Sequence, residues 1–164
     1  MKKLEIIQNK IFSDTEKLKH ILAIWRFKGY KIVFTNGCFD LLHLGHVDYL
    51  VKAAGKGDKL IVGLNTDSSV TRLKGPGRPI TDQHSRAMVL AAMSFVSMVV
   101  LFDEETPFKI ISKIQPDILV KGADYNPEDI VGYNVVMEKG GKVETIEFLP
   151  GYSTSAIEAK IRNS

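Results

Sequence analysis

The chain has 164 residues, of which 45% are hydrophobic and 25% are charged, and its formal net charge at pH 7 is +3. These values predict one domain with its own core and exclude a disordered or fibrous protein. The sequence shows neither a dense Lys/Arg run nor an apolar stretch of membrane-spanning length, so we expect a cytoplasmic protein that binds small anionic ligands, not nucleic acid or membranes. Cys38 is the only cysteine, which excludes an internal disulfide and a cysteine-based zinc site.

The predicted elements alternate between strand and helix along the chain. An amphipathic helix near residues 14–28, within a helical leader of residues 1–30, comes first. Five short runs rich in β-branched or aromatic residues are the predicted strands: 31–35, 59–64, 97–102, 117–122 and 142–148. The predicted helices between and after them are 44–55, 82–94, 106–114, 127–139 and a last one after Ser153. This alternation predicts an α/β, Rossmann-like, doubly wound sheet of five parallel strands in a single domain, residues 1–164.

Capping residues and prolines mark the expected helix starts and one loop. Thr106 and Asn126 each precede a proline, which predicts an N-cap followed by proline at the first helical position. Ser155 and Glu158 have the spacing of a capping box for the last helix. Residues 73–80, LKGPGRPI, are predicted to form a loop because they contain two glycines and two prolines.

The segment NGCFDLLHLGH, residues 36–46, follows the first predicted strand and contains two histidines three residues apart. In a doubly wound sheet, ligands bind beyond the carboxyl ends of the strands, where this segment lies. Gly45 allows a ligand to approach the start of the next helix, whose unpaired N–H groups attract phosphate. His43 and His46 add imidazole donors. The segment therefore predicts a phosphate-binding site.

The residues alone leave other interpretations open. Either histidine can be a packed, hydrogen-bonded residue. A zinc site is less favoured, because Asp40 is the only other ligand evident nearby, and Asp40 can equally be a turn or capping residue. Two cations of the 73–80 loop, Lys74 and Arg78, can be solvated.

Two later residues also have plainer roles. Arg86 can pair with Asp82 on one helix face, at a spacing of four residues. Ser155 can act as a helix cap without binding a ligand.

The motif GCFDLLHLGH resembles the His-x-Gly-His signature of the nucleotidylyltransferase superfamily, which includes class I aminoacyl-tRNA synthetases. The similarity continues through LIVGLNTDSSVTRLKGPGRPI, RAMVLAAMSFVSMVVLFDEETP, PDILVKGADYNPEDIVG and GYSTSAI. Over roughly residues 31–160 the chain resembles the adenylyltransferase domain of bacterial enzymes that make ADP-heptose for lipopolysaccharide. The resemblance implies transfer of AMP from ATP to D-glycero-β-D-manno-heptose 1-phosphate, with release of pyrophosphate. It also implies a separate heptose kinase in the same pathway and favours a homodimer.

The resemblance implies roles for individual residues. His43 and His46, with Lys74 and Arg86, would stabilise the transition state at the α-phosphate, and Arg78 would contact the substrate from a lid. Mg²⁺ would bridge the phosphates, placed by Asp40 directly or through water. The residues implied to bind the nucleotide are Asn36, Gly37, Cys38, Phe39, Gly45, Gly122, Asp124, Ser153, Thr154 and Ser155.

Two rival functions come from the same residues. A cytidylyltransferase acting on glycerol 3-phosphate or phosphoethanolamine would share the signature, although GTFD is more usual there than the GCFD of this chain. A nucleotide-binding module without turnover belongs to a different class. A fragment of a tRNA synthetase is disfavoured, because the sequence shows no lysine-rich second signature.

Overall fold

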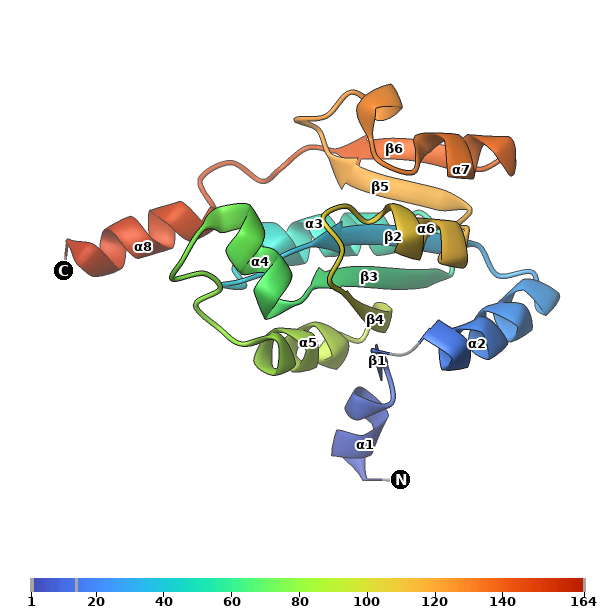
Figure 1. Ribbon diagram of the computed structural model, residues 1–164, viewed down its shortest axis with the longest axis horizontal. Helices are drawn as coiled ribbons and strands as arrows, with labels where there is room; N and C mark the ends of the chain where they lie inside the picture. Colours follow the sequence, from blue (N-terminus) through green and yellow to red (C-terminus); the bar gives the residue numbers. More distant parts are fainter. Residues whose placement is uncertain (1, 14, 164) are drawn as a thin grey trace.

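The computed structural model describes residues 2–13 and 15–163. Its six strands form one sheet in the order β1-β4-β3-β2-β5-β6, and every neighbouring pair is parallel (Figure 1). The strands are β1 (Ile11–Phe12), β2 (Ile32–Gly37), β3 (Lys59–Asn65), β4 (Val96–Phe102), β5 (Ile118–Gly122) and β6 (Lys142–Ile146). The predicted parallel α/β fold is confirmed, with one strand more than expected.

Helices cover both faces of this sheet. The helices are α1 (Lys3–Gln8), α2 (Thr15–Phe27), α3 (Leu44–Ala54), α4 (Asp67–Lys74), α5 (Gln83–Ala92), α6 (Phe108–Ile114), α7 (Tyr133–Glu138) and α8 (Thr154–Arg162), with a short 3₁₀ helix at Pro127–Asp129. Apolar side chains of α3 and α5 pack on one face, and those of α2, α6 and α7 pack on the other. The two-sided covering explains why the central strands are apolar almost throughout. None of the described helices is long and apolar enough to cross a membrane.

Several boundaries differ from the sequence-based expectations. Strand β1 has only two residues, too few for a periodic signal, and it interrupts the predicted helical leader of residues 1–30 between α1 and α2. Helix α4 was not predicted. The predicted helix 127–139 is wrong as a continuous element. Gly132 adopts a φ of 92°, in the left-handed region, and separates the 3₁₀ helix from α7.

Two predicted helix caps are also wrong. Helix α6 begins at Phe108, so Pro107 and not Thr106 occupies the N-cap position. Helix α8 is capped by Ser153, whose hydroxyl accepts a hydrogen bond from the Ala156 N–H at 3.1 Å, and Ser155 lies inside the helix. The Asn126 N-cap is confirmed, although its side chain makes no capping bond.

The strand order reverses between β2 and β5. From β2 the chain builds outward through β3 and β4, and then crosses back to add β5 and β6 on the other side of β2. Val33 and Phe34 of β2 pair with Ile118 and Leu119 of β5. A crevice opens at such a switch point beyond the carboxyl ends of the strands. Figure 1 shows α8 beyond that same edge of the sheet.

Candidate active site

A cavity of about 560 Å³ lies at the switch point, where the segments after β2 and β5 meet the starts of α3 and α8. Most residues predicted for the site line it: Asn36, Gly37, Cys38, Phe39, Asp40, His43, Gly45, His46, Lys74, Gly122, Asp124, Ser153 and Thr154. Three predicted residues are not part of the lining: Arg78, Arg86 and Ser155. Residues that the sequence did not single out complete it: Tyr49, Lys121, Tyr125, Phe148, Leu149 and Tyr152.

The two histidines lie against each other at one wall of the cavity. The ring centroids of His43 and His46 are 3.9 Å apart, and their planes are inclined by 21°. Phe39 packs edge-on against His46 with a centroid separation of 5.4 Å, and its own φ of 45° is unusual for a bulky residue. The Nδ1 atoms of both imidazoles are buried and have no hydrogen-bond partner among the described residues. A buried polar atom without a partner is costly, so these atoms indicate a site for a polar ligand.

Two helix N-termini converge beside the histidines. Helix α3 starts directly after His43, and α8 starts directly after Ser153. A Cβ atom on Gly45 would lie 3.1 Å from both the His43 ring and the Tyr152 Cβ, so a larger residue here would push these neighbours outward by a few tenths of an ångström. Neither helix has an acidic residue in its first turn. The unpaired N–H groups and positive dipole ends of both helices are therefore available to an anion.

Asp40 anchors the 75–80 loop to the segment after β2. Its carboxylate is buried and accepts hydrogen bonds from the main-chain N–H groups of Ile80 and Thr81, and from Arg78 at 3.1 Å. These donors hold the pKa of Asp40 below its usual value although burial acts to raise it. Arg78 also pairs with Glu158 of α8. Asp40 thus has the turn role that the sequence left open, and Arg78 joins the loop to α8.

Arg86 is buried and binds four residues from three segments of the chain. Its guanidinium donates to the carbonyls of Thr81, Cys38 and Asn65 at 3.1, 2.6 and 2.9 Å. It also pairs with Asp67 at 2.7 Å, whereas the alternative partner suggested by the sequence, Asp82, instead caps α5. Because only 2% of Arg86 is exposed and it does not line the cavity, the structure shows a positioning residue. Its predicted contact with phosphate remains untested.

Comparison with known proteins agrees with this geometry. Residues 34–160 match the model of the family described as cytidylyltransferase-like, a stretch that includes every predicted site residue. The chain belongs to this family. The prediction of a nucleotidylyltransferase is thereby confirmed at the level of the family.

The relatives of this cytidylyltransferase-like chain include longer proteins. "Bifunctional protein HldE" of Citrifermentans bemidjiense is 57% identical over 151 residues, which cover 92% of this chain and 31% of the relative. The protein of the same name from Wolinella succinogenes is 54% identical, over 96% of this chain and 32% of the relative. The chain thus spans about a third of the length of these relatives.

Solved structures show the same fold. A lipopolysaccharide core biosynthesis protein from Thermoplasma volcanium is 29% identical, with a TM-score of 0.61 over 74% of this chain and 98% of that one. A pantoate-beta-alanine ligase from Francisella tularensis is 15% identical, with a TM-score of 0.63 over 93% of this chain and 76% of that one, and supports the fold alone.

The wall of the cavity that the sequence did not predict is largely aromatic. Tyr49 is buried, hydrogen-bonds Thr35 at 2.7 Å and faces Phe148 at a centroid distance of 5.9 Å, and burial raises the pKa of its hydroxyl to about 12. A Cβ on Gly122 would come within 2.2 Å of the Phe148 ring, so this glycine lets the ring close over β5. Beside it lies Lys121, which is the only charged residue of β5.

A protein-held metal site is not evident at this cavity. The described residues include no cluster of three or more His, Cys, Asp or Glu side chains that could hold a metal ion, which disfavours the zinc alternative. The carboxylate oxygens of Asp40 already accept several hydrogen bonds, so its donor set does not fit direct coordination of Mg²⁺. The role of Asp40 toward Mg²⁺ remains a prediction.

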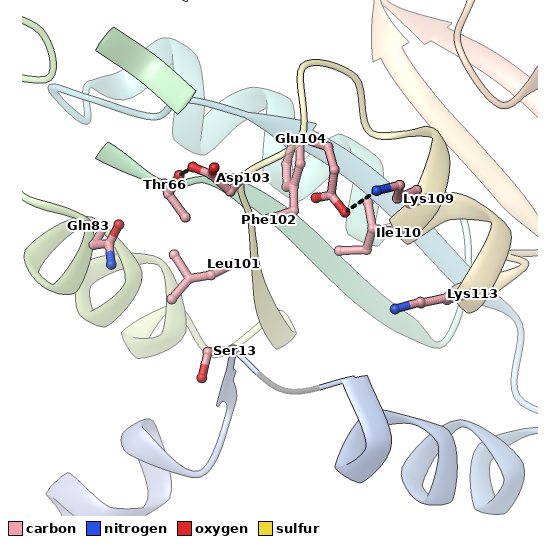
Figure 2. Close-up of a pocket in the computed structure, with 10 residues that line it drawn as sticks. All are labelled: Ser13, Thr66, Gln83, Leu101, Phe102, Asp103, Glu104, Lys109, Ile110 and Lys113. Carbon is pink, nitrogen blue, oxygen red and sulfur yellow. Dashed lines mark hydrogen bonds and ion pairs between the residues drawn. The ribbon is translucent and has the colours of Figure 1, made fainter. Parts of the chain in front are cut away.

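A second cavity, of about 490 Å³, lies near the carboxyl end of β4 (Figure 2). Its carboxylates have partners: Asp103 accepts from Thr66, and Glu104 lies 3.8 Å from Lys109. No unpartnered buried polar atom among the described residues belongs to its lining. The first cavity is therefore the candidate active site.

The surroundings of both histidines in the active site favour the neutral imidazole. Burial, followed by repulsion from positive charge on His43 and Lys74, lowers the pKa of His46 to about 4, although the main chain of Leu41 acts in the opposite direction. Burial also lowers the pKa of His43. Two stacked imidazoles cannot both be charged cheaply unless an anion lies beside them.

We expect this pKa shift to make the protein less stable in acid. The folded state releases the His46 proton near pH 4 and the unfolded state near pH 6.5, so the stabilising effect of the neutral ring is lost as the pH falls between these values. The loss due to His46 is no more than about 3 kcal/mol, reduced further because the ring is partly exposed. The loss is measured by urea unfolding at a series of pH values, which gives the free energy of unfolding of wild type and of His46→Gln.

The exposed His84 provides the matched control. The His84→Gln variant should keep the acid slope of the wild type, whereas His46→Gln should flatten it. An unchanged slope in His46→Gln would contradict the assignment of a depressed pKa to this ring.

Proposed function

We propose that the protein transfers AMP from ATP to D-glycero-β-D-manno-heptose 1-phosphate, giving ADP-heptose and pyrophosphate for lipopolysaccharide synthesis. Support for the substrates comes from the relatives named HldE and from the lipopolysaccharide core biosynthesis protein with the same fold. Support for the chemistry comes from the cavity, where unpartnered imidazole nitrogens lie beside two helix N-termini. This anion-binding arrangement is the observation on which the proposal rests.

The reaction needs no covalent attachment to the protein. An oxygen of the sugar phosphate attacks the α-phosphorus of ATP, the new O–P bond forms, and the bond from the α-phosphorus to the bridging oxygen of pyrophosphate breaks. The attacking oxygen is already anionic, so no general base is required. The barrier is mainly the repulsion between the two phosphates, on the order of 4 kcal/mol for each close charge pair in a protein-like dielectric. Donors and cations aimed at the α-phosphate therefore supply most of the catalysis.

The described residues have complementary roles in this step. His43, His46 and the start of α8 would hold the triphosphate, with Lys74 at the end of α4 adding a charge beside His46. The aromatic wall formed by Tyr49, Phe148 and their neighbours would pack on the nucleoside. Mg²⁺, carried by the nucleotide phosphates, would neutralise charge when bound.

The remaining features of the proposal concern partners and location. A heptose kinase would supply the phosphorylated acceptor. The homodimer and the cytoplasmic location expected from the sequence remain predictions.

A nucleotide and acceptor screen tests the proposal. We expect pyrophosphate release, measured by a coupled assay with Mg²⁺ present, with ATP and heptose 1-phosphate together, and none when either is omitted. CTP with glycerol 3-phosphate or phosphoethanolamine serves as the comparison. Pyrophosphate release with CTP and one of these acceptors, but not with ATP, would replace the proposal by a second candidate, a cytidylyltransferase. The description of the matched family favours this second candidate. Nucleotide binding without pyrophosphate release for any acceptor would indicate a non-catalytic module.

A further inference from the structure

The cations around the cavity divide into paired and unpaired groups. Arg78 pairs with Asp40 and Glu158, and Arg86 pairs with Asp67, so both arginine charges are already balanced by carboxylates. Lys74 and Lys121 line the cavity, and their side-chain ammonium groups have no hydrogen bond or ion pair to any described residue. Both lie close enough to Cys38 to act on its thiol, so they flank the loop after β2. The reaction must balance two phosphorylated substrates, and these two lysines are the charges available for it.

Lys121 comes from the face of the sheet opposite to α3, the helix that begins at the histidines. Lys74 is near enough to His46 to lower the pKa of its imidazole, whereas Lys121 is not among the charges that act on His46. Side chains of a strand point alternately to its two faces. Val120 packs with the α3 and α5 core, so Lys121 lies on the opposite face, with the preceding Leu119.

Asn36 lies on that same face at the end of β2. The preceding residue, Thr35, hydrogen-bonds Tyr49 of α3, which places Asn36 on the other face. The β2–β5 register pairs Phe34 with Leu119, and continuing it by two residues places Asn36 opposite Lys121. The Oδ1 atom of Asn36 is buried and has no hydrogen-bond partner in the part of the chain that the structure describes. An unpaired ammonium and an unsatisfied amide thus share one corner of the cavity, away from the histidines.

We propose that Lys121 and Asn36 form the subsite for the attacking phosphate of the acceptor sugar, with Lys121 binding the phosphate and Asn36 binding an adjacent hydroxyl. The inference rests on the proposed function and extends it to Lys121, which the sequence did not single out, and to Asn36, for which the family resemblance implied a nucleotide contact. In an in-line displacement the nucleophile enters on the side of the α-phosphorus opposite to the departing pyrophosphate. If His43 and His46 hold the pyrophosphate side, the acceptor phosphate must lie on the other side, where Lys121 and Asn36 are.

Burial supports a ligand at this position. Burial lowers the pKa of Lys121, although Asp124 acts in the opposite direction. The side chain lies 5.6 Å from the centre of the Tyr125 ring, which is a weak substitute for a counter-ion. A partly buried ammonium of this kind costs stability until an anion pairs with it.

Two measurements on Lys121→Met test the subsite. The first is the calorimetric affinity of inorganic phosphate for the protein saturated with α,β-methylene-ATP, which does not depend on turnover or on the identity of the sugar. We expect Lys121→Met to weaken phosphate binding by about tenfold to a hundredfold, the usual effect of one charge-assisted contact. The affinity for α,β-methylene-ATP itself should change by less than about threefold, which is small on the same scale.

The second measurement is steady-state kinetics with ATP and heptose 1-phosphate. The KM for the sugar phosphate should rise in Lys121→Met while the KM for ATP stays close to the wild-type value. Lys121→Arg keeps the positive charge, so its KM for the sugar phosphate should be close to the wild-type value. Because arginine stays charged to higher pH than lysine, this variant should also bind the acceptor at a higher pH than wild type does. Lys142→Met removes an exposed lysine from the start of β6 and should change neither constant.

The outcomes separate this inference from the proposed function. Loss of phosphate affinity in Lys121→Met supports the subsite even if the wild type does not use heptose 1-phosphate, a result that would overturn only the substrate. A loss confined to nucleotide affinity, or no loss in either measurement, overturns the subsite. The thermal unfolding midpoint of Lys121→Met should equal or exceed that of wild type, and a marked decrease would identify a structural lysine instead.

Discussion

The His46→Ala variant is expected to turn over about two to three orders of magnitude more slowly than wild type while binding ATP almost as well. Negative charge accumulates on the α-phosphoryl oxygens only as the sugar phosphate attacks. An imidazole donor directed there gains most of its interaction energy in the transition state, so its loss lowers kcat more than it changes ATP affinity. Pyrophosphate release under saturating substrates measures the first quantity, and calorimetry with α,β-methylene-ATP measures the second.

Two controls make this result specific to His46. His84→Ala replaces an exposed histidine of α5 and should keep full turnover. His46→Asn retains a side-chain donor and should recover part of the lost rate. A kcat for His46→Ala equal to that of wild type would remove this residue from the catalytic group and return it to the packed role that the sequence left open.

The Arg86→Met variant is expected to lower the free energy of unfolding by about 3 to 5 kcal/mol, the usual cost of removing one partner from a buried ionic network. Methionine fills similar space but leaves the carbonyls of Cys38, Asn65 and Thr81 without their donor. Because these carbonyls belong to segments around the cavity, both KM and kcat should worsen. Urea unfolding followed by circular dichroism gives the stability, with Arg72→Met as the control.

Arg72 is a suitable control because its ion pair with Asp103 is exposed to solvent. The Arg72→Met variant should leave the free energy of unfolding almost unchanged. If Arg86→Met were as stable as wild type but bound ATP poorly, Arg86 would be a phosphate ligand after all, as the family resemblance implied.

Local sequence signals were sufficient for much of the fold and for one half of the site. The apolar strands 59–65 and 118–122 and the His43–His46 pair show their roles within a few residues of sequence. Short or polar elements give no such local signal. Strand β1 has two residues, and α4 has few apolar side chains to show a helical period. The break at Gly132 depends on a left-handed backbone conformation that glycine permits but does not require, so the residue type alone does not reveal it.

The remaining half of the site depends on contacts between distant segments. Arg86 finds three of its four partners 19, 21 and 48 residues away, so the sequence cannot distinguish a buried link from a phosphate ligand. Lys121 is a single lysine in an apolar strand, and its isolation becomes informative only when the neighbouring strand places Asn36 opposite it. The sequence does contain one signal for this role: a single lysine near the carboxyl end of an apolar strand, where ligands bind in this fold.

Helix α8 contributes no buried side chain among its described residues. Its start nevertheless carries Ser153 and Thr154 into the cavity, and its Glu158 reaches back to Arg78. Both side chains of this pair are largely shielded from solvent, so salt weakens it only in part. Removing one of the two charges would therefore loosen the terminal helix without opening the sheet core, to which α8 contributes no buried side chain, and the start of α8 would no longer be held at the cavity.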